Sequence, residues 1–230
     1  MAKSKMIKEL ANGEVSLHVA LKRAKILLKE FNNDALTKWV EQELTGYTDV
    51  ESIPAYRITR GSLRGTYIRH LPRTQTTYKN VSIPVGKMPD DLVEEMLRMY
   101  FCEGAEELAH LMDSGNAKPL VKHIPADVYP TIAKYNIPML MEIVTAYVET
   151  STPSVQGVLS AIESKLLDMF YYLEKQFGVL DELDIDIDSK TAEEQKDIIN
   201  HIYVLIYNDH RVTIGDNNKI KETTIASTME

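Results

Sequence analysis

Residues 39–47, with the segment 54–57 that follows them, constrain the fold of this chain more than any other feature, because they lead from a helix into a sheet. Apolar residues recur at helical spacing from Leu36 to Leu44. Gly46 then supplies the residue type that ends helices in a left-handed conformation. After residue 54 the chain is rich in β-branched and aromatic residues, which favour strands. This junction predicts a fold that mixes helices with a sheet.

A second amphipathic helix is predicted directly before this one. Ser16 is placed to cap a helix that runs to about residue 31, along which apolar residues recur every three or four positions. Residues 32–33, both asparagine, break this helix, and Asp34 is expected to cap the next one. Two helices joined by so short a link should pack as an antiparallel hairpin. Trp39 is expected to be the packing anchor of this hairpin.

Three short segments after the helical hairpin are predicted as strands, either of a small antiparallel sheet or of a β-hairpin plus one separate strand. They cover residues 56–60, 63–69 and 78–85, and turn-forming residues separate them. Pro84 lacks the N–H that a central strand needs, so it places the last strand at an edge or ends its pairing.

The second half of the chain is predicted to be built around one long helix over residues 153–177, which stops at Gly178. Before it, residues 89–101 predict another helix. Residues 139–148 also fit a helical stripe, but their β-branched residues favour a strand. After it, residues 202–226 contain strand formers and a turn, and predict a short terminal β element.

Together these patterns predict an α+β protein that is mainly helical. It would consist of an N-terminal helical hairpin, a small antiparallel sheet, a long helix in the C-terminal half and a short terminal β element. Residues 1–112 would hold the hairpin, the sheet and the next helix, and residues 113–230 the long helix and the terminal β segment. We expect the two segments to form one continuous compact unit.

Charge and cysteine content narrow the class of protein. The chain has 26 lysines and arginines against 34 acidic residues, a formal net charge of −8, which argues against a surface that binds nucleic acid everywhere. A single cysteine, Cys102, allows no intramolecular disulfide and fits a reducing compartment. The N-terminal residues lack the apolar core of a secretory signal, and no window resembles a membrane span. A cytoplasmic protein without membrane association is expected.

Glu43, Tyr47, Tyr56 and Arg57 form the candidate polar cluster of the helix-to-sheet junction. An arginine at such a junction can bind a phosphate or a carboxylate through two parallel hydrogen bonds. The alternative, which we favour, is that Arg57 pairs with Glu43 and that Tyr47 fills the open end of the hairpin.

Residues 56–79 are much more basic than the rest of this acidic chain. Basic residues interleaved with aromatic ones on a sheet are typical of proteins that hold single-stranded nucleic acid. In a strand, however, Tyr67 and Arg69 share one face while Thr66 and Ile68 take the other, so a solvated sheet face is the favoured alternative. The basic and aromatic residues concerned are Arg57, Arg60, Arg64, Arg69, His70, Arg73, Lys79, Tyr56, Tyr67 and Tyr78.

No residue pattern in the sequence predicts a metal site, a cofactor site or a catalytic set. Asp184, Asp186 and Asp188 have the spacing of the first calcium ligands of an EF-hand. Ser189 then stands where that loop needs glycine, and Gln195 where it needs glutamate. Acids that alternate with apolar residues are also typical of a half-buried edge strand.

Three segments together resemble the AbiTii domain family of bacterial abortive-infection proteins. The first runs from residue 16 through Trp39, Glu43 and Tyr47 to the Pro-x-Tyr-Arg of residues 54–57. The second is the apolar helix of residues 155–174, in which Glu163 stands where the family pattern has arginine. The third is the segment 213–220. This resemblance implies defence against bacteriophage, and it implies no reaction, because the family has no assigned one.

Under this resemblance we expect an effector or sensor that binds a phage or host macromolecule, either a protein or a nucleic acid. Arg57 and the basic sheet face would make the contact, and the helical hairpin or the terminal strands could form a homo-oligomer. One alternative is a nuclease-type toxin in which acids such as Glu43 or Asp184 bind a divalent ion. Another is a non-catalytic adaptor for a neighbouring defence enzyme.

Overall fold

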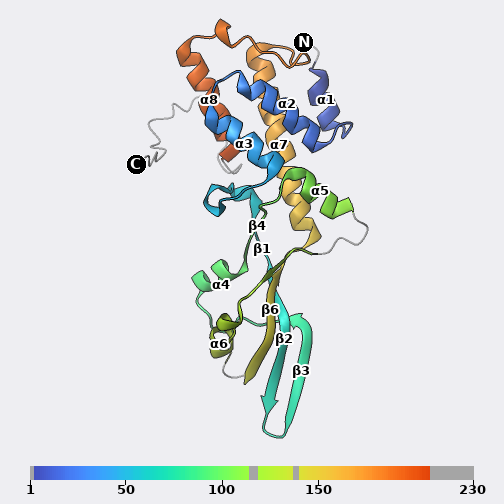
Figure 1. Cartoon of the computed structure of the whole chain (residues 1–230), viewed down its shortest axis with the longest axis vertical. Coiled ribbons are helices and arrows are strands. Elements are labelled where there is room, and N and C mark those ends of the chain that lie inside the picture. The colour runs from blue at the N-terminus through green and yellow to red at the C-terminus, as the bar shows by residue number, and fades with distance from the viewer. Residues whose placement is uncertain (1–2, 114–118, 137–139, 208–230) are drawn as a thin grey trace.

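The computed structural model describes residues 3–113, 119–136 and 140–207. Within these ranges helices and strands gather at opposite ends of an elongated molecule (Figure 1), which confirms the mainly helical α+β fold. The helical lobe consists of α1 (Lys5–Ala11), α2 (Leu17–Lys29), α3 (Asp34–Thr45), α5 (Ala105–Asp113), α7 (Thr152–Phe177) and α8 (Ala192–Tyr207). The sheet lobe consists of β2 (Ser62–Leu71), β3 (Thr74–Ser82), β5 (Val121–His123), β6 (Met141–Glu149), α4 (Asp90–Leu97) and α6 (Tyr129–Lys134).

The N-terminal helical hairpin of α2 and α3 is confirmed, with one correction at its turn. Ser16 caps α2, because its Oγ accepts a hydrogen bond from a first-turn backbone N–H at 3.3 Å. The cap of α3 is Asn33, whose side chain accepts from the N–H of Leu36 at 3.0 Å. Asp34, the expected cap, is instead the first helical residue. Trp39 is 1% exposed within the apolar core of the helical lobe, as expected of a packing anchor.

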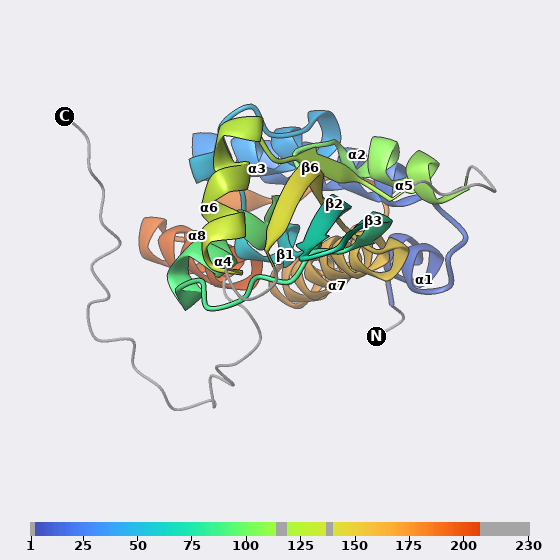
Figure 2. The same ribbon diagram turned by 90° about the horizontal axis from the view of Figure 1, so that it is seen from below.

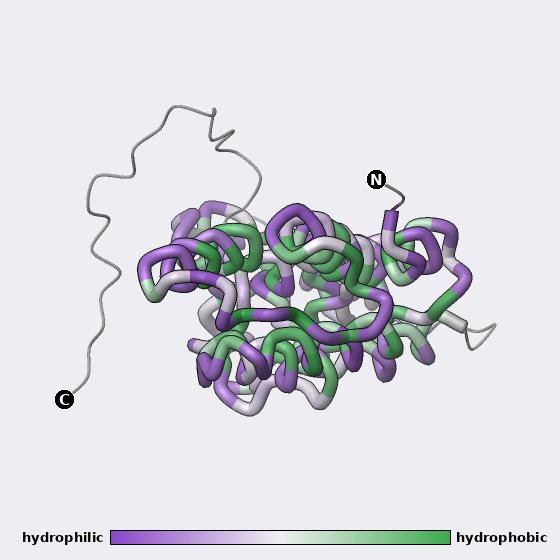
Figure 3. Tube along the Cα trace, turned by 90° about the horizontal axis from the view of Figure 1, so that it is seen from above, coloured by the Kyte–Doolittle hydropathy of each residue, from purple (hydrophilic) through white to green (hydrophobic). Residues whose placement is uncertain are grey.

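The long helix predicted over residues 153–177 is α7, which packs against α1, α2, α5 and α8. A proline fits its first turn, where no helical N–H is lost, and Gly178 ends it with a φ of 87°. Figure 3, seen from the helical end, shows hydrophobic and hydrophilic stretches alternating along the helices. No helix in the described residues is long and apolar enough to cross a membrane. The buried residues of α7 are Val155, Val158, Ile162, Lys165, Leu166, Met169, Phe170 and Leu173.

Two segments after α7 that were expected to be strands are not strands. Residues 202–207 form the last turns of α8, which starts from a capping box between Thr191 and Glu194. The isoleucines at positions 198, 202 and 206 recur every four residues and are buried in the helical lobe, so packing overrides their β preference. Residues 183–186 form a bend and an irregular segment, and residue 187 begins the short 3-10 helix Ile187–Ser189. The rest of the expected terminal β element, residues 208–226, lies outside the described residues.

The sheet has the strand order β3-β2-β6-β5, with antiparallel neighbours. Its members confirm the strands predicted at 63–69, 78–85 and 139–148, and β3 is an outer strand that ends before Pro84. The registers of both neighbours of β2 shift beside Thr66, where Asn80 has a φ of 52°. Leu63 and Tyr67 are buried on one face of β2, and the intervening side chains are more exposed.

The helix expected over residues 89–101 ends early, because its last part is a strand. α4 stops at Leu97, and β4 (Arg98–Tyr100) pairs antiparallel with β1 (Ile58–Arg60). Backbone hydrogen bonds from Gly61 to Leu97 at 2.8 Å and from Phe101 to Arg57 at 3.0 Å flank this ribbon. The ribbon connects the two lobes (Figure 1). Cys102 follows the ribbon in a loop and is half-buried.

The chain passes between the lobes more than once, so each lobe draws on distant parts of the sequence. It enters the sheet lobe after β1, leaves through β4, returns at β5 and leaves again through β6 into α7. Figure 2 shows β6, β2 and β3 side by side, with α4 and α6 towards the β6 side. One apolar cluster fills the helical lobe and a second lies between the sheet, α4 and α6. Both lobes therefore contain elements from residues 1–112 and from residues 113–230.

Candidate functional site

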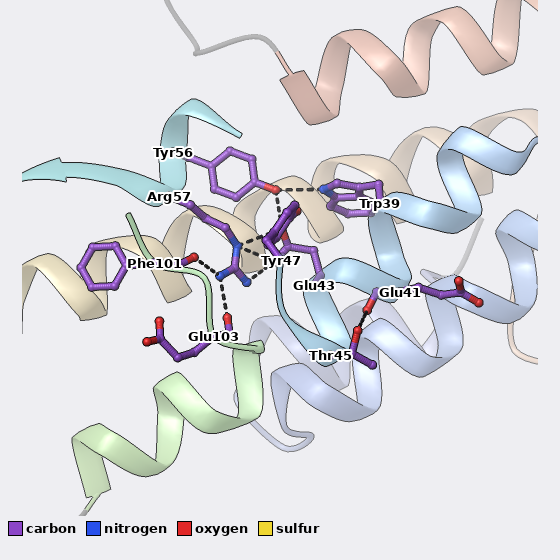
Figure 4. Close-up of polar contacts among 9 residues, drawn as sticks. All are labelled: Trp39, Glu41, Glu43, Thr45, Tyr47, Tyr56, Arg57, Phe101 and Glu103. Carbon is purple, nitrogen blue, oxygen red and sulfur yellow. Dashed lines mark hydrogen bonds and ion pairs between the residues drawn. The ribbon is translucent and has the colours of Figure 1, made fainter. Parts of the chain in front are cut away.

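A buried polar cluster lies where the two lobes meet, and it contains Glu43, Tyr47, Tyr56 and Arg57 (Figure 4). Glu43 projects from α3, and Tyr56 and Arg57 belong to the short 3-10 helix Ala55–Arg57 that precedes β1. The structure thus brings together the four residues that the sequence proposed as a polar cluster.

Gly46 positions this cluster by allowing close contact between two backbones. Its φ is 95°, and a Cβ at this position would lie 2.6 Å from the carbonyl oxygen of Cys102. The next residue, Tyr47, donates its backbone N–H to the same carbonyl at 2.7 Å. Glycine at position 46 therefore lets the end of α3 pack directly on the loop between β4 and α5, and turns the Tyr47 side chain back towards Glu43.

Arg57 and Glu43 form an ion pair from which water is excluded. The Arg57 Nη2 atom lies 2.6 Å from Glu43 Oε2, and both side chains are 0% exposed. The Nε atom donates to both carboxylate oxygens, at 3.1 and 3.2 Å. The Nη1 atom donates to the backbone carbonyls of Phe101 at 2.9 Å and Glu103 at 2.8 Å. One guanidinium thus connects α3 with the residues that follow β4.

Two tyrosines complete the hydrogen bonding of the Glu43 carboxylate. Tyr47 and Tyr56 donate their hydroxyls to Glu43 Oε1, at 2.6 and 2.7 Å. The hydroxyl of Tyr56 in turn accepts a hydrogen bond from Trp39 Nε1 at 2.9 Å. A buried carboxylate is tolerated when it is paired and fully hydrogen-bonded, and these contacts meet that condition.

Burial and the charge of Glu43 set the protonation of the cluster. Burial alone would lower the pKa of Arg57, but the hydrogen bonds and the charge of Glu43 outweigh it and raise that pKa. Burial raises the pKa of Tyr47 and of Tyr56, and the negative charge of Glu43 raises both further. The cluster therefore holds a charged guanidinium and two neutral phenols around the carboxylate.

Lys165 is a member of this region that the sequence analysis missed. It is 3% exposed on α7, lies 4.9 Å from the ring centroid of Tyr56, and donates to the carbonyl of Leu205 in α8 at 3.1 Å. Its position three residues after Ile162 puts a lysine on the apolar face of α7. A lysine on an otherwise apolar face was the sequence signal for a paired buried charge.

In the structure described, the contacts of this cluster link α3 to the 3-10 helix before β1 and to the residues after β4. The polar atoms of Arg57 point to Glu43 and to two carbonyls inside the protein, so the pairing of Arg57 with Glu43 that the sequence favoured is present. The same contacts occupy the Glu43 oxygens, which are then not free to bind the divalent ion of a nuclease-type toxin. Among the described residues, no three His, Cys, Asp or Glu side chains gather where a metal ion could be held.

The other candidate residues lie on different faces of the sheet. Arg64 extends from one face, pairs with Glu149 at 3.1 Å and donates to the carbonyl of Asn80 at 2.8 Å. Tyr67 lies on the opposite face, is 7% exposed and stacks on Tyr78 with ring centroids 4.9 Å apart. Arg69 shares the face of Tyr67. The predicted surface of interleaved arginines and tyrosines is therefore divided between two faces.

Removal of the Arg57 side chain should destabilise the protein strongly, because it leaves the Glu43 carboxylate buried without its counter-ion. We expect Arg57→Ala to lower the free energy of unfolding by about 3–5 kcal/mol in urea titrations. The matched control is Arg60→Ala, which removes an exposed pair with Glu94 and should cost at most about 1 kcal/mol. Similar losses in the two variants would contradict this structural role.

The raised pKa of Tyr47 predicts a loss of stability in alkaline solution. A phenol that holds its proton more tightly when folded stabilises the fold below pH ~10, and this contribution is lost as pH rises towards the folded pKa. Above pH ~10, the free energy of unfolding should fall less steeply in Tyr47→Phe, by up to about 1.4 kcal/mol per pH unit. The control Tyr171→Phe, at a 54% exposed ring, should keep the original slope. Equal slopes in all three proteins would contradict the prediction.

Comparison with known proteins assigns the family. The AbiTii family model matches residues 4–200, which include the helical lobe up to α8, the polar cluster and the whole sheet lobe. The comparisons with curated proteins and with solved structures found no match. Because the family match covers most of the chain, this protein belongs to the AbiTii family.

Proposed function

We propose that this chain is a phage-defence protein that binds a phage or host macromolecule through its exposed β2–β3 hairpin, residues 62–82. AbiTii membership suggests a role in abortive infection. The hairpin enters the proposal because of its charge and its exposure. The Glu43–Arg57 cluster would hold the two lobes together, so that the hairpin is presented by a rigid body.

One observation carries this proposal. Between Glu51 and Asp90 the sequence contains seven lysines and arginines and no acidic residue, although the whole chain has a formal net charge of −8. Such a local excess of positive charge attracts anionic partners and increases the rate of association.

Three cations of the hairpin have no acidic partner in the part of the chain that the structure describes. Arg73 in the turn and Lys79 on β3 are exposed, and Arg69 on β2 is half-buried with an Nε atom that makes no hydrogen bond. Among the described residues, no carboxylate forms an ion pair with any of the three. By contrast, Arg60 and Arg64 pair with glutamates of other elements. The net positive charge of the hairpin thus lies in its turn, on its outer strand and at Arg69, close to the turn on β2.

The position of the hairpin suits a contact with a large partner. Its turn lies at the end of the molecule furthest from the helical lobe (Figure 1), and β3 is the outer strand of the sheet. Seven of the nine β3 side chains are exposed. A partner can therefore reach the whole outer strand without any movement of the sheet lobe.

Phage plating on a bacterial host that expresses the chain tests the proposal. The intact protein should lower plating efficiency for at least one phage of a broad panel, and Arg73→Glu/Lys79→Glu should restore it to that of a host without the protein. The control Lys8→Glu/Lys22→Glu makes the same charge change at exposed positions of the helical lobe and should keep the defence.

Circular dichroism would establish that both double variants are folded. Defence that survives in the hairpin variant would contradict the assignment of the contact surface. The absence of defence by the intact chain against the whole panel would contradict a self-sufficient effector, and it is the result expected of an adaptor that needs a neighbouring enzyme.

A further inference from the structure

Building on the proposed function, we infer that the partner of the β2–β3 hairpin is the phosphate backbone of a double-stranded nucleic acid. Phosphates, exposed protein cations and hydroxyl groups are the components of binding that does not depend on base sequence. The hairpin offers these protein groups and lacks the open aromatic rings that single strands require.

The aromatic rings of the hairpin are turned inward. Proteins that hold single-stranded nucleic acid stack the bases on exposed aromatic faces. Tyr67 and Tyr78 stack on each other at 4.9 Å with an interplanar angle of 19°, and both pack against the apolar cluster of the sheet lobe. The ring faces that stack on each other are therefore not available for unpaired bases, and the single-strand mode that the sequence offered beside a solvated sheet face lacks a stacking platform here.

The face of the sheet that carries Arg64, here called the open face, does not suit a polyanion. Register places Glu142, Tyr147 and Glu149 of β6 opposite Ile68, Arg64 and Ser62 of β2 on this face. His70 and Arg64 already pair with these carboxylates, at 3.0 and 3.1 Å. The ring of Tyr147 thus lies on a face that carries acidic groups, which repel phosphate. A nucleic acid is therefore expected along the outer edge and the turn of the hairpin.

The outer edge combines cations with hydroxyl donors. Arg73 is exposed in the turn, Lys79 is exposed at the sixth of the nine β3 positions, and three exposed threonines, Thr74, Thr76 and Thr77, lie between them. Alternation along β3 puts Thr77 and Lys79 on one face of the strand and Thr74 and Thr76 on the other, so a partner that lies along the edge can reach both sets. Lysine, arginine and threonine are among the residues that most often contact phosphate oxygens. No base-reading arrangement is needed for this contact, so we expect binding to be independent of base sequence.

The spacing of the two exposed cations along the outer edge favours a duplex over a single strand. At about 3.3 Å per residue, Arg73 and Lys79 lie roughly 20 Å apart along the strand. A duplex is stiff over about 50 nm, so it keeps its phosphates in regular positions along an edge of this length. A flexible single strand would have to be straightened and ordered, with no stacking to compensate for the loss of entropy.

Fluorescence anisotropy with three labelled probes tests this inference: a short DNA duplex, an RNA duplex of the same sequence, and one DNA strand alone. We expect the full chain to bind one or both duplexes more tightly than the single strand at low salt. Arg73→Ala/Lys79→Ala should weaken duplex binding and reduce the slope of log K against log salt concentration by about 2. Arg73→Lys/Lys79→Arg keeps both charges and should keep the slope.

The matched control is Lys8→Ala/Lys22→Ala, which removes two exposed positive charges from the helical lobe and should leave duplex binding unchanged. Tighter binding of the single strand, or an equal loss in the control and the hairpin variant, would overturn the inference. The absence of binding to all three probes would also overturn it. In either case, phage plating with the hairpin variant decides separately whether the proposed contact surface stands.

Discussion

The ion pair between Glu43 and Arg57 is the interaction on which the packing of α3 against the ends of the β1–β4 ribbon depends. Two opposite charges with no exposed surface are stable only when every strong hydrogen-bonding group has a partner. Those partners come from α3, from the residues after β4 and from the 3-10 helix before β1. Lys165 brings α7 and α8 to the same region. A change in any of these elements would leave a buried charge without its partner, so the elements are held in one arrangement.

The sequence suggested one set of residues for two roles, internal pairing and contact with a partner, and the structure assigns these roles to different residues. Arg57 is committed to internal contacts, whereas Arg73 and Lys79 are exposed and have no acidic partner among the described residues. The cluster links α3 to the two ends of the β1–β4 ribbon, and the hairpin carries the charge that an anionic partner would meet. The salt bridges of Arg60 and Arg64 leave the excess positive charge of the hairpin on Arg69, in the turn and on the outer strand.

Local signals in the sequence were enough to predict most of the fold. Caps and periodic apolar residues predicted α2, α3 and α7, because these helices are amphipathic. The same reasoning failed for α8, because tertiary packing holds the β-branched residues of positions 202–207 in a helix. It also failed for β4, because this strand pairs with a strand about 40 residues earlier in the sequence. The polar cluster was predictable from Glu43 and Arg57. The contribution of the Phe101 and Glu103 carbonyl groups was not predictable, because every residue has a backbone carbonyl and the residue type does not show which one accepts a hydrogen bond.

The coupling free energy between positions 43 and 57 tests the central claim most directly. It is measured as a double-mutant cycle of urea unfolding with Glu43→Leu, Arg57→Met and the combined variant, in which apolar side chains replace both charges. Our account predicts that each single change destabilises the protein, because it leaves one buried charge unpaired. It also predicts that the combined variant loses at least about 2 kcal/mol less than the sum of the two single losses. Single losses that add to within about 0.5 kcal/mol would contradict it.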